Sequence, residues 1–503
     1  MIIDGAALEK YHGEADVVVV GSGAGGANVA LRLVELGLKV IVLEYGAAKT
    51  NADFSQEDAV ALPMLYHEAG MRLVSGDANF PMLGAKTLGG STVVNSGICF
   101  RAPRNILDTF VAKNGIDWAQ AATIDPAFDW VEKYMRVGPQ SDEVLGTHNL
   151  VTRGAYQNMG WHTEKIPRNA PTCVGCGVCQ LGCPSGGKYS VDKAQIAAGL
   201  EKGLTVLTRA RADKIVMDRS IARGVEGALI ENDGHTPRGF FSIKAKAVVS
   251  SAGAIDTPML LQRSGLGGID EGIGRGLKIH PPVGVFGYFP NRDIHMWNGV
   301  TQGIYSDQFM SEGMLLESAA SMTAPIFFAA GAGVTMDVFE WMRLMPHLAL
   351  SGLMIHDQGE GTVRNGPLGK ALIKYHFAPY DLERLKRGVL LIGEAYLKAG
   401  AQAALPAVRG TRLCKNLGEL KDLVAGVTHP AHLQLYASHP QATVRMHADR
   451  TQGPLSPRFN LHAVKNLFVA DASIFPDCLG VNPQITIMAA ARLAGAHVAE
   501  AVA

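Results

Sequence analysis

The sequence predicts an α/β fold with at least two lobes, one of them built on a doubly wound parallel sheet. At 503 residues the chain is too long for one ordinary hydrophobic core. Its hydrophobic fraction of 47% is typical of a compact globular protein and not of a disordered one. The third observation is local. A buried strand, a glycine-rich turn, a helix and a second strand follow one another near the N-terminus.

The first of these elements is Asp16–Val20, whose run of valines suits a strand buried on both faces. Three glycines follow it. Gly21 permits a tight turn, Gly23 lets the backbone approach a pyrophosphate, and Gly26 lets the helix pack closely on the strand. The helix is expected over residues 27–36, and its N-terminal N–H groups and dipole would face the phosphates.

The second strand is expected over residues 39–43, and Glu44 stands at its carboxyl end. A carboxylate at this position can accept hydrogen bonds from both ribose hydroxyls and repels a 2′-phosphate. Strand, glycine triplet, helix, strand and acid in this order predict a dinucleotide site. The pattern does not distinguish NAD from FAD.

Charge balance and apolar patterning bear on the binding partners and on the cellular location of the protein. Lys plus Arg and Asp plus Glu both number 46, so the formal net charge is zero and a nucleic-acid partner is not expected. Residues 1–14 lack the apolar run of a secretory signal, and no stretch has the roughly 20 uninterrupted apolar residues that span a bilayer. We therefore expect a soluble, cytoplasmic protein without a transmembrane segment.

Three further segments carry a family resemblance: a glycine-rich loop at residues 88–97, a strand–turn–helix start at residues 246–258, and a C-terminal block at residues 438–486. Together and in this order they resemble the glucose–methanol–choline (GMC) oxidoreductase family, closest in pattern to its fatty alcohol oxidase and cholesterol oxidase branch. The resemblance implies an FAD-binding lobe and an α+β substrate or cap lobe with an antiparallel sheet. It also implies oxidation of an alcohol carbon by hydride transfer to the flavin.

The resemblance assigns cofactor residues as well. The three glycines and Glu44 match the half of the site that binds ADP. The other matching positions are Gly90, Ser91 and Asn95 in the loop along the flavin and pyrophosphate, Ala212 near the adenine, Asp471 near the ribityl chain and pyrophosphate, and Asn482 and Pro483 beside the isoalloxazine ring. The helix that follows can offer its N-terminus to the flavin anion.

A catalytic pair is implied in the C-terminal block. Alcohol oxidation needs a base for the hydroxyl proton, and histidine suits this role because its ordinary pKa lies near neutrality. By resemblance His439 is the base, and Asn482 is its partner that orients the substrate oxygen. His447 is the rival for the base, with a surface or structural role as its alternative. His280 is expected near the flavin or the lobe interface.

A cysteine run stands apart from these motifs, within residues 173–184. Its spacing, C-x₂-C-x₂-C-x₃-C-P, is that of the iron–sulfur run in bacterial ferredoxins. We predict an iron–sulfur cluster, [4Fe–4S] before [3Fe–4S], with the ligands Cys173, Cys176, Cys179 and Cys183.

Other interpretations of the cysteine run stay open. Zinc usually takes two separated pairs of ligands, and disulfides are unusual in a cytoplasmic chain. The cysteines could also be structural. In two-cluster ferredoxins the fourth cysteine serves the other cluster, so one cluster held by all four needs a different loop path. The isolated Cys99, Cys414 and Cys478 are expected in the core.

An iron–sulfur cluster would favour one type of flavin reaction over the others. A flavin that passes electrons singly to a cluster suits a dehydrogenase with an external acceptor such as a quinone, a cytochrome or a ferredoxin. The alternatives are an oxygen-using alcohol oxidase with a structural cysteine site, a non-redox flavin lyase and a binding-only protein. The intact pair of His439 and Asn482 disfavours the last. A partner subunit or a homo-oligomer is possible.

Two lobes are expected to alternate along the chain. Residues 1–105, 187–290 and 432–503 form the FAD-binding domain, and residues 106–186 and 291–431 form the cap or substrate domain. The cap is rich in methionine and aromatic residues: Met310, Met314, Met322, Phe327, Phe328, Met336, Phe339, Trp341, Met342, Met345 and Met354. Each alone suits an ordinary core, but together they suggest an adaptable apolar pocket. We therefore expect a bulky apolar alcohol: a long-chain, terpenoid, steroid-like or aromatic one.

Overall fold

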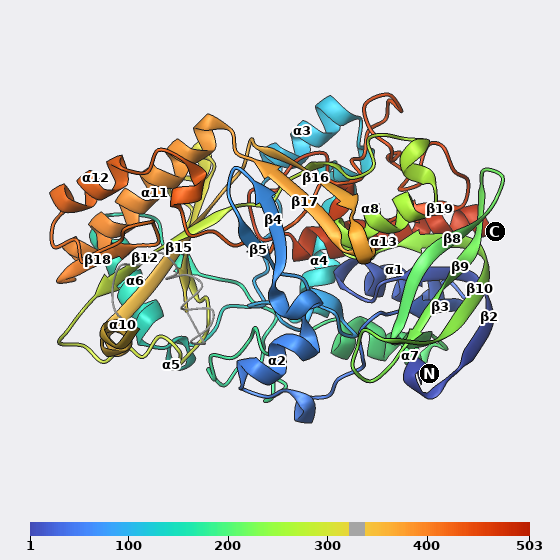
Figure 1. Ribbon diagram of the computed structural model, residues 1–503, viewed down its shortest axis with the longest axis horizontal. Helices are drawn as coiled ribbons and strands as arrows, with labels where there is room; N and C mark the ends of the chain where they lie inside the picture. The colour runs from blue at the N-terminus through green and yellow to red at the C-terminus, as the bar shows by residue number, and fades with distance from the viewer. Residues whose placement is uncertain (321–337) are drawn as a thin grey trace.

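The computed structural model describes residues 1–320 and 338–503. Three sheets follow one another along its longest axis (Figure 1). An eight-stranded sheet lies at one end, a six-stranded sheet at the other, and a five-stranded sheet between them. The chain crosses between these regions several times, so each sheet combines segments far apart in the sequence.

The eight-stranded sheet has the order β1-β7-β3-β2-β10-β9-β8, and β19 also pairs with β10. Its strands are β1 Ile2–Asp4, β2 Lys10–Val20, β3 Val40–Leu43, β7 Thr205–Thr208, β8 Ala210–Asp218, β9 Ile221–Ile230, β10 Pro237–Ser250 and β19 Leu467–Val469. The pairs from β1 to β10, and β10 with β19, are parallel, whereas β9 pairs antiparallel with both β8 and β10. All four valines of the predicted first strand are buried, as expected for a strand covered on both faces.

Two helices from opposite ends of the chain pack together on this sheet. Helix α1 (Ala24–Glu35) follows β2, and α13 (Gln484–Val502) lies against α1 and α4 (Ala121–Tyr134). By length and composition alone α13 could also cross a membrane, although polar residues interrupt its apolar stretch. In this fold its apolar residues join the main hydrophobic core.

The six-stranded sheet is antiparallel throughout and has the order β18-β12-β15-β14-β13-β6. Its strands are β6 Glu164–Lys165, β12 Pro282–Tyr288, β13 Ile304–Ser306, β14 Met314–Ala319, β15 Leu348–Ile355 and β18 Ala403–Pro406. Helix α11 (Pro379–Lys398) packs on it so closely that a Cβ at Gly388 would lie 2.1 Å from the Leu353 side chain. Helix α12 (Leu417–Ala425) packs in turn on α11.

The five-stranded sheet joins the two ends and has the order β11-β16-β17-β4-β5. Its strands are β4 Arg72–Gly76, β5 Phe80–Met82, β11 Arg275–Leu277, β16 Glu360–Asn365 and β17 Ala371–His376. The remaining α-helices of the described residues are α2 Asp58–Leu65, α3 Arg104–Asn114, α5 Asp142–Leu145, α6 Thr147–Asn158, α7 Ala197–Glu201, α8 Gly253–Arg263 and α10 Val338–Leu344.

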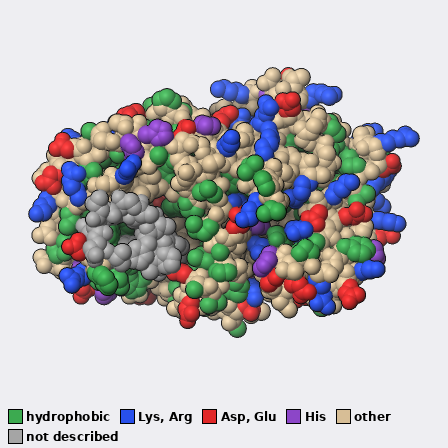
Figure 2. Space-filling view, viewed as in Figure 1, with side chains coloured by type: hydrophobic (Ala, Val, Ile, Leu, Met, Phe, Trp, Pro, Cys, Tyr) green, Lys and Arg blue, Asp and Glu red, His purple; other side chains and the backbone are tan. Residues whose placement is uncertain are grey.

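The predicted fold class is confirmed: a doubly wound sheet in one region and an α+β region with an antiparallel sheet in another. Some boundaries differ. The first strand begins at Lys10, and the helix begins at Ala24 instead of residue 27. The division into two alternating domains stays a prediction. Acidic and basic side chains are interspersed on the face shown in Figure 2, as the balanced composition implies.

Candidate functional site

The glycine turn between β2 and α1 is shaped by close backbone approaches. Gly21 has a φ of +95°, which disfavours any side chain. A Cβ at Gly26 would lie 1.9 Å from the Gly21 carbonyl oxygen, in line with its predicted role in close packing. The tightest contact is at Gly25, where a Cβ would lie 1.8 Å from the carbonyl oxygen of Ala470. The sequence analysis did not single out Gly25, because its partner is more than 400 residues away.

Gly23 and Gly90 face each other across the start of a large cavity. A Cβ at Gly90 would come 2.8 Å from the Gly23 Cα, whereas a Cβ at Gly23 would meet nothing nearer than 3.8 Å. The loop that follows is held in place on both sides. The Ala85 N–H donates to Ser91 Oγ at 3.2 Å, and Asn95 Nδ2 donates to Gln484 Oε1 at 2.9 Å. The two predicted cofactor loops thus form one glycine-lined cradle at the start of α13.

Two buried carboxylates stand at this cradle. Glu44 accepts hydrogen bonds from the N–H and Oγ of Ser22 and from the N–H of Gly46, and burial raises its pKa. Asp471 accepts from the Gly253 N–H and from Thr257 and Ser473, and burial raises its pKa too. Glu44 accepts three hydrogen bonds and keeps a lone pair that a ligand hydroxyl can use. The four hydrogen bonds that Asp471 accepts, two on each oxygen, occupy its lone pairs and fix the carboxylate in position.

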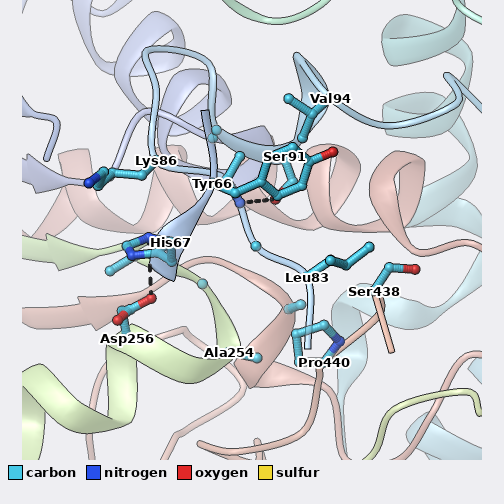
Figure 3. Close-up of a pocket in the computed structure, with 18 of the residues that line it drawn as sticks. Tyr66, His67, Leu83, Lys86, Ser91, Val94, Ala254, Asp256, Ser438 and Pro440 are labelled. Carbon is cyan, nitrogen blue, oxygen red and sulfur yellow. Dashed lines mark hydrogen bonds and ion pairs between the residues drawn. The ribbon is translucent and has the colours of Figure 1, made fainter. Parts of the chain in front are cut away.

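These residues line one continuous cavity of about 1210 Å³. Figure 3 shows part of its wall, in which Tyr66, Ser91 and Val94 lie on one side, and Leu83, Ala254, Ser438 and Pro440 lie on the other. The cavity runs from the glycine turn, Glu44 and Ala212 past Asp471 to His439, Asn482 and Pro483. Every predicted cofactor or catalytic residue lines it except Gly26, which packs behind the turn.

At the far end of the cavity His439 and Asn482 are the predicted pair. Burial lowers the pKa of His439 to about 4, so the imidazole is neutral near pH 7. Asn482 is buried, and its Oδ1 has no hydrogen-bond partner in the described part of the chain. A neutral imidazole and an unpartnered amide oxygen at a cavity wall can bind a hydroxyl group and accept its proton.

His447, the rival for the base, and His280 do not line this cavity. The Asp449 N–H donates to Nδ1 of His447, away from the lining. His280 is buried behind His439, with ring centroids 5.8 Å apart, and its Nε2 accepts from the Gly480 N–H at 3.0 Å. His280 therefore supports the C-terminal block instead of facing the cavity.

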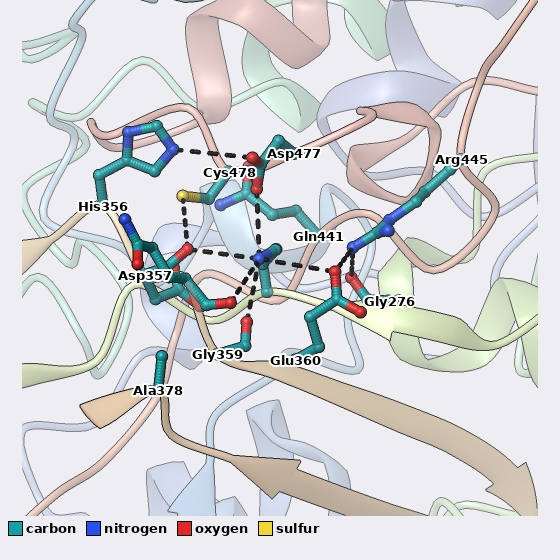
Figure 4. A network of polar contacts seen from close by, with 12 residues as sticks. Gly276, His356, Asp357, Gly359, Glu360, Ala378, Gln441, Arg445, Asp477 and Cys478 are labelled. Carbon is teal, nitrogen blue, oxygen red and sulfur yellow. Dashed lines mark hydrogen bonds and ion pairs between the residues drawn. The ribbon is translucent and has the colours of Figure 1, made fainter. Parts of the chain in front are cut away.

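A polar network holds this block in position (Figure 4). The Asp357 carboxylate accepts the backbone N–H groups of Ile279 and His280 and the hydroxyl of Tyr375. Lys278 donates to the carbonyl oxygens of residues 357–359 and lies 3.4 Å from Asp477 Oδ1. The network ties the block that carries His439 and Asn482 to β11, β15 and β16.

The four cysteines of the predicted cluster occupy one irregular loop beside the cavity. Cys179 and Cys183 are buried, Cys173 and Cys176 are half-buried, and all four are free thiols. Burial raises the pKa of the Cys176 thiol, and the three other thiols add to the effect, so the four sulfurs lie near one another. Among the described residues, no three of these four sulfurs lie within 4.8 Å of one another.

Two buried cations face these sulfurs, and the sequence analysis missed both. Arg168 is fully buried, and its guanidinium donates to Cys179 Sγ at 3.3 Å and lies 3.9 Å from Cys173 Sγ. The Lys188 ammonium is also buried and donates to the carbonyl oxygens of Val93, Asn95 and Cys179. Within residues 1–320 and 338–503 neither cation forms an ion pair with a carboxylate.

The cysteine loop also reaches the cavity wall. Gln180, between two of the cysteines, lines the cavity and donates from Nε2 to Ser96 Oγ at 3.1 Å. Its carbonyl oxygen accepts the Tyr66 hydroxyl at 2.7 Å. Lys188 bridges the same loop to Asn95. The cysteine loop and the predicted flavin loop are therefore one connected structure.

The methionine and aromatic residues of the cap do not form the cavity as predicted. Among the described members of that set only Met354 lines it. Met314 belongs to the core of the six-stranded sheet, Trp341 packs edge-on against Phe286, and Phe339 is 71% exposed. Met322, Phe327, Phe328 and Met336 lie outside the described residues. The apolar wall comes mainly from residues that the sequence did not point to: Leu83, Val94, Ile98, Pro282, Leu353 and Tyr436.

One carboxylate at the substrate end was also missed. Glu317 on β14 is 4% exposed, lines the cavity and accepts from Gln302 Nε2 at 3.1 Å. Burial raises its pKa to about 8, although hydrogen bonds with Asn482 and Gln302 lower it in part. A single acid within the apolar strand Met314–Ala319 was the only sign of it in the sequence.

Comparison with known proteins agrees with this site. Two protein-family models match the chain, at residues 16–282 and at residues 358–491, and each is described as GMC oxidoreductase. An uncharacterized GMC-type oxidoreductase of Mycobacterium tuberculosis is 36% identical over 95% of this chain and 74% of its own length. A long-chain-alcohol oxidase of Arabidopsis thaliana is 30% identical over 96% of this chain and 67% of its own. The crystal structure of pyridoxine 4-oxidase from Mesorbium loti superposes with a TM-score of 0.71 at 17% identity, covering 96% of this chain and 98% of that one.

The chain therefore belongs to the GMC oxidoreductase family. It is an FAD-dependent oxidoreductase of the GMC type that acts on alcohols, which confirms the predicted family, enzyme class and flavin.

Proposed function

We propose that the protein oxidises a bulky apolar alcohol to a carbonyl compound and passes the electrons through an iron–sulfur cluster to an external acceptor. The observation that carries the proposal is the continuity of the cavity. One space is lined at one end by the dinucleotide turn and at the other by His439 and Asn482. A cofactor and a substrate can therefore meet in it without crossing solvent.

The residues present fit FAD. The glycines at 23 and 90 let the two loops approach closely, because a Cβ on Gly90 would come 2.8 Å from the Gly23 Cα, and the backbone of this turn is the part that would lie along a pyrophosphate. Glu44 would hold the ribose, Ala212 the adenine, and Asp471, Ser91 and Asn95 the ribityl and pyrophosphate part. The N-terminus of α13 after Pro483 would face the flavin ring. When bound, FAD supplies the acceptor at N5 for the hydride that leaves the alcohol carbon.

His439 serves as the base in this proposal. Its neutral imidazole accepts the hydroxyl proton, and Asn482 holds the substrate oxygen while that proton leaves. His280, behind His439, and the Asp357 network keep the imidazole at the cavity wall.

The substrate class rests on the wall around the pair. Leu353, Met354, Ile98 and Pro282 present apolar surface there, and Glu317 is the acidic side chain among them. An apolar lining with few polar groups suits a bulky apolar alcohol and not a sugar. The long-chain-alcohol oxidase fits this range of alcohols. A choline oxidase of Arthrobacter globiformis, 27% identical over 94% of this chain and 92% of its own length, is named for a small cationic alcohol and does not fit it.

The iron–sulfur cluster rests on charge and spacing. Two buried cations without a carboxylate partner need negative charge nearby, and the thiolates of a bound cluster supply it. A single zinc ion holds its four sulfurs at about 2.3 Å, which brings them within about 4 Å of one another. Each thiolate of a cubane binds a different iron, so its sulfurs stand farther apart. A cubane is therefore compatible with described residues in which no three of these sulfurs lie within 4.8 Å of one another. When bound, such a cluster carries single electrons away from the flavin.

The external acceptor is a quinone, a cytochrome or a ferredoxin-like protein in this proposal, and the location is cytoplasmic. The half-buried Cys173 and Cys176 mark the side of the loop that faces solvent. An oxygen-dependent oxidase is the second candidate, because several relatives carry oxidase names. Hydrogen peroxide formed in step with alcohol consumption would favour that candidate.

The test of the base is reduction of the bound flavin by candidate alcohols under anaerobic conditions. The variant His439→Ala should slow reduction by about 10²- to 10⁴-fold, the usual contribution of a positioned base. The variant His447→Ala is the matched control and should reduce at the normal rate. Equal rates for His439→Ala and the unaltered protein would refute the assigned base.

A further inference from the structure

One buried side chain joins the glycine-rich loop of the cavity to the cysteine loop. Arg168 is fully buried, and its Nε donates to the Ser96 carbonyl oxygen at 2.7 Å. Its Nη2 donates to Cys179 Sγ at 3.3 Å. Ser96 lines the cavity next to Asn95, one of the predicted flavin residues. The guanidinium therefore stands between the cavity wall and the Cys179 sulfur.

The backbone around Arg168 holds the guanidinium in this position. The Arg168 N–H donates to the Gly138 carbonyl oxygen at 2.9 Å, and the Gly138 N–H donates back to the Arg168 carbonyl oxygen at 3.1 Å. The chain at Gly97 packs against the guanidinium, because a Cβ there would lie 3.8 Å from Nη2. A guanidinium fixed in this way is a permanent positive charge that does not have to reorganise when the charge beside it changes.

The second buried cation, Lys188, contacts the cysteine loop differently. Its ammonium donates to three carbonyl oxygens, two in the glycine-rich loop and one at Cys179. The Lys188 group that reaches a sulfur is its backbone N–H, which lies 3.3 Å from Cys183 Sγ. Lys188 thus ties the two loops together, whereas the charged group of Arg168 touches a sulfur directly.

We propose that Arg168 is a positioning residue that acts through Cys179 and raises the reduction potential of the cysteine site, so that the site accepts electrons from the flavin. Each electron that arrives adds one negative charge to the site. A fixed cation 3.3 Å from a ligand sulfur stabilises the state with the added charge more than the state without it. This inference rests on the proposed function, in which the four thiolates hold an iron–sulfur cluster.

The electrons and protons of this transfer balance. Each oxidised alcohol delivers two electrons, which leave one at a time through the cysteine site to the external acceptor of the proposed function. The two protons of the reaction go to solvent, one of them by way of His439. Arg168 itself gains and loses nothing, so its contribution is a constant electrostatic one.

The surroundings of Arg168 leave its charge available to the sulfurs. Its Nη1 lies 3.9 Å from Cys173 Sγ, so the guanidinium is shared between two of the four cysteines. In the described ranges it forms no ion pair with a carboxylate that would neutralise it. Because the region is buried, water and salt screen the interaction only weakly.

The experiment measures the midpoint potential of the iron–sulfur signal in the anaerobic holoenzyme, by a redox titration followed by electron paramagnetic resonance. Two neutral replacements are compared: Arg168→Gln, which keeps an N–H donor, and Arg168→Met, which fills the space without one. Both should lower the midpoint potential by about 59 mV or more, a tenfold or larger change in the ratio of oxidised to reduced protein. Arg168→Lys, which keeps the charge, should lie closer to the unaltered protein. The control Arg387→Gln, at an exposed arginine paired with Glu312, should leave the potential unchanged.

Two outcomes would overturn the inference: a neutral variant with the potential of the unaltered protein, or an Arg168→Lys protein with a potential as low as that of Arg168→Gln. Flavin and iron contents identify the variants that have folded, and one folded neutral variant is enough to decide. Failure of the proposed function looks different, because the unaltered protein would then contain no iron and give no signal, and the inference would fall with it. Iron, a signal and an unchanged potential in the neutral variants would leave the cluster in place and remove only the role of Arg168.

Discussion

At the scale of single residues, this site depends on close backbone approaches between distant segments. The contact of Gly25 with Ala470 is the clearest case, because it joins the first helix to the segment that carries Asp471. The sequence identified the glycine turn and its partners Glu44 and Asp471. It could not identify Gly25 or Glu317, because their importance arises from neighbours that only the fold brings close.

Replacing Gly25 by alanine should destabilise the protein by about 3 kcal/mol or more, because the new Cβ overlaps a carbonyl oxygen in a packed core. Urea unfolding followed by circular dichroism measures the change. Gly154 in α6 is the matched control, since a Cβ there meets nothing within 4 Å. Gly154→Ala should stabilise the protein by about 0.5–1 kcal/mol. Equal stabilities for the two variants would contradict the assigned contact.

At the scale of elements, the cysteine loop at residues 173–184 is an irregular segment that carries four thiols. Its spacing in the sequence predicted four grouped thiols, and the structure groups them. The sequence contained no sign that two buried cations would favour negatively charged thiolates here. Arg168 and Lys188 flank the cysteine run, but neither belongs to a recognisable motif. Their burial without carboxylate partners is a property of the fold.

Replacing Cys179 by serine should remove most of the iron and acid-labile sulfide from anaerobically purified protein, because the ligand that Arg168 contacts at 3.3 Å is lost. Reduction of the flavin by substrate should persist, while turnover with a one-electron acceptor should fall. Cys414→Ala is the control, since Cys414 is buried far from the loop in the core of the six-stranded sheet. Zinc without iron, or no metal, in the unaltered protein would refute the cluster.

At the scale of the whole molecule, the class of fold was predictable because it rests on repeated local patterns. The buried valine strand, the glycine turn and the order of the motifs gave the doubly wound region. The lining of the substrate end was not predictable. The methionines and aromatics that suggested a pocket lie mostly in a core or at the surface where described, since hydrophobic composition alone does not say which cavity a side chain faces.

Neutral histidines distributed over the molecule should make it sensitive to acid: His148 is fully buried, and His67 and His439 are partly buried at the cavity wall. Burial lowers the pKa of His148 and of His439 to about 4 and that of His67 to about 3. The unfolded chain takes up these protons below about pH 6.5 and the folded chain does not, so stability is full above that pH and falls as the pH drops toward 4. Each such group should cost up to about 1.4 kcal/mol per pH unit.

Urea unfolding at several values between pH 7.5 and pH 4.5 tests this sensitivity. His148→Gln should make the loss of stability shallower by about 1.4 kcal/mol per pH unit, because one titrating group is removed. His12→Gln at an exposed position should leave the slope unchanged. Parallel slopes for all three proteins would contradict the assignment of His148 as a neutral buried group.

The pairing of β19 with β10 and the contact of Gly25 with Ala470 have a consequence for biosynthesis. The turn that receives the cofactor is made early in translation, yet its opposite wall, from Ala470 to Gln484, is made more than 400 residues later. A nascent chain can form β2 and α1 but cannot enclose a dinucleotide until that wall has left the ribosome. Cofactor capture is thus coupled to late stages of synthesis, and incomplete chains would expose an open, glycine-lined edge to the quality-control machinery of the cell.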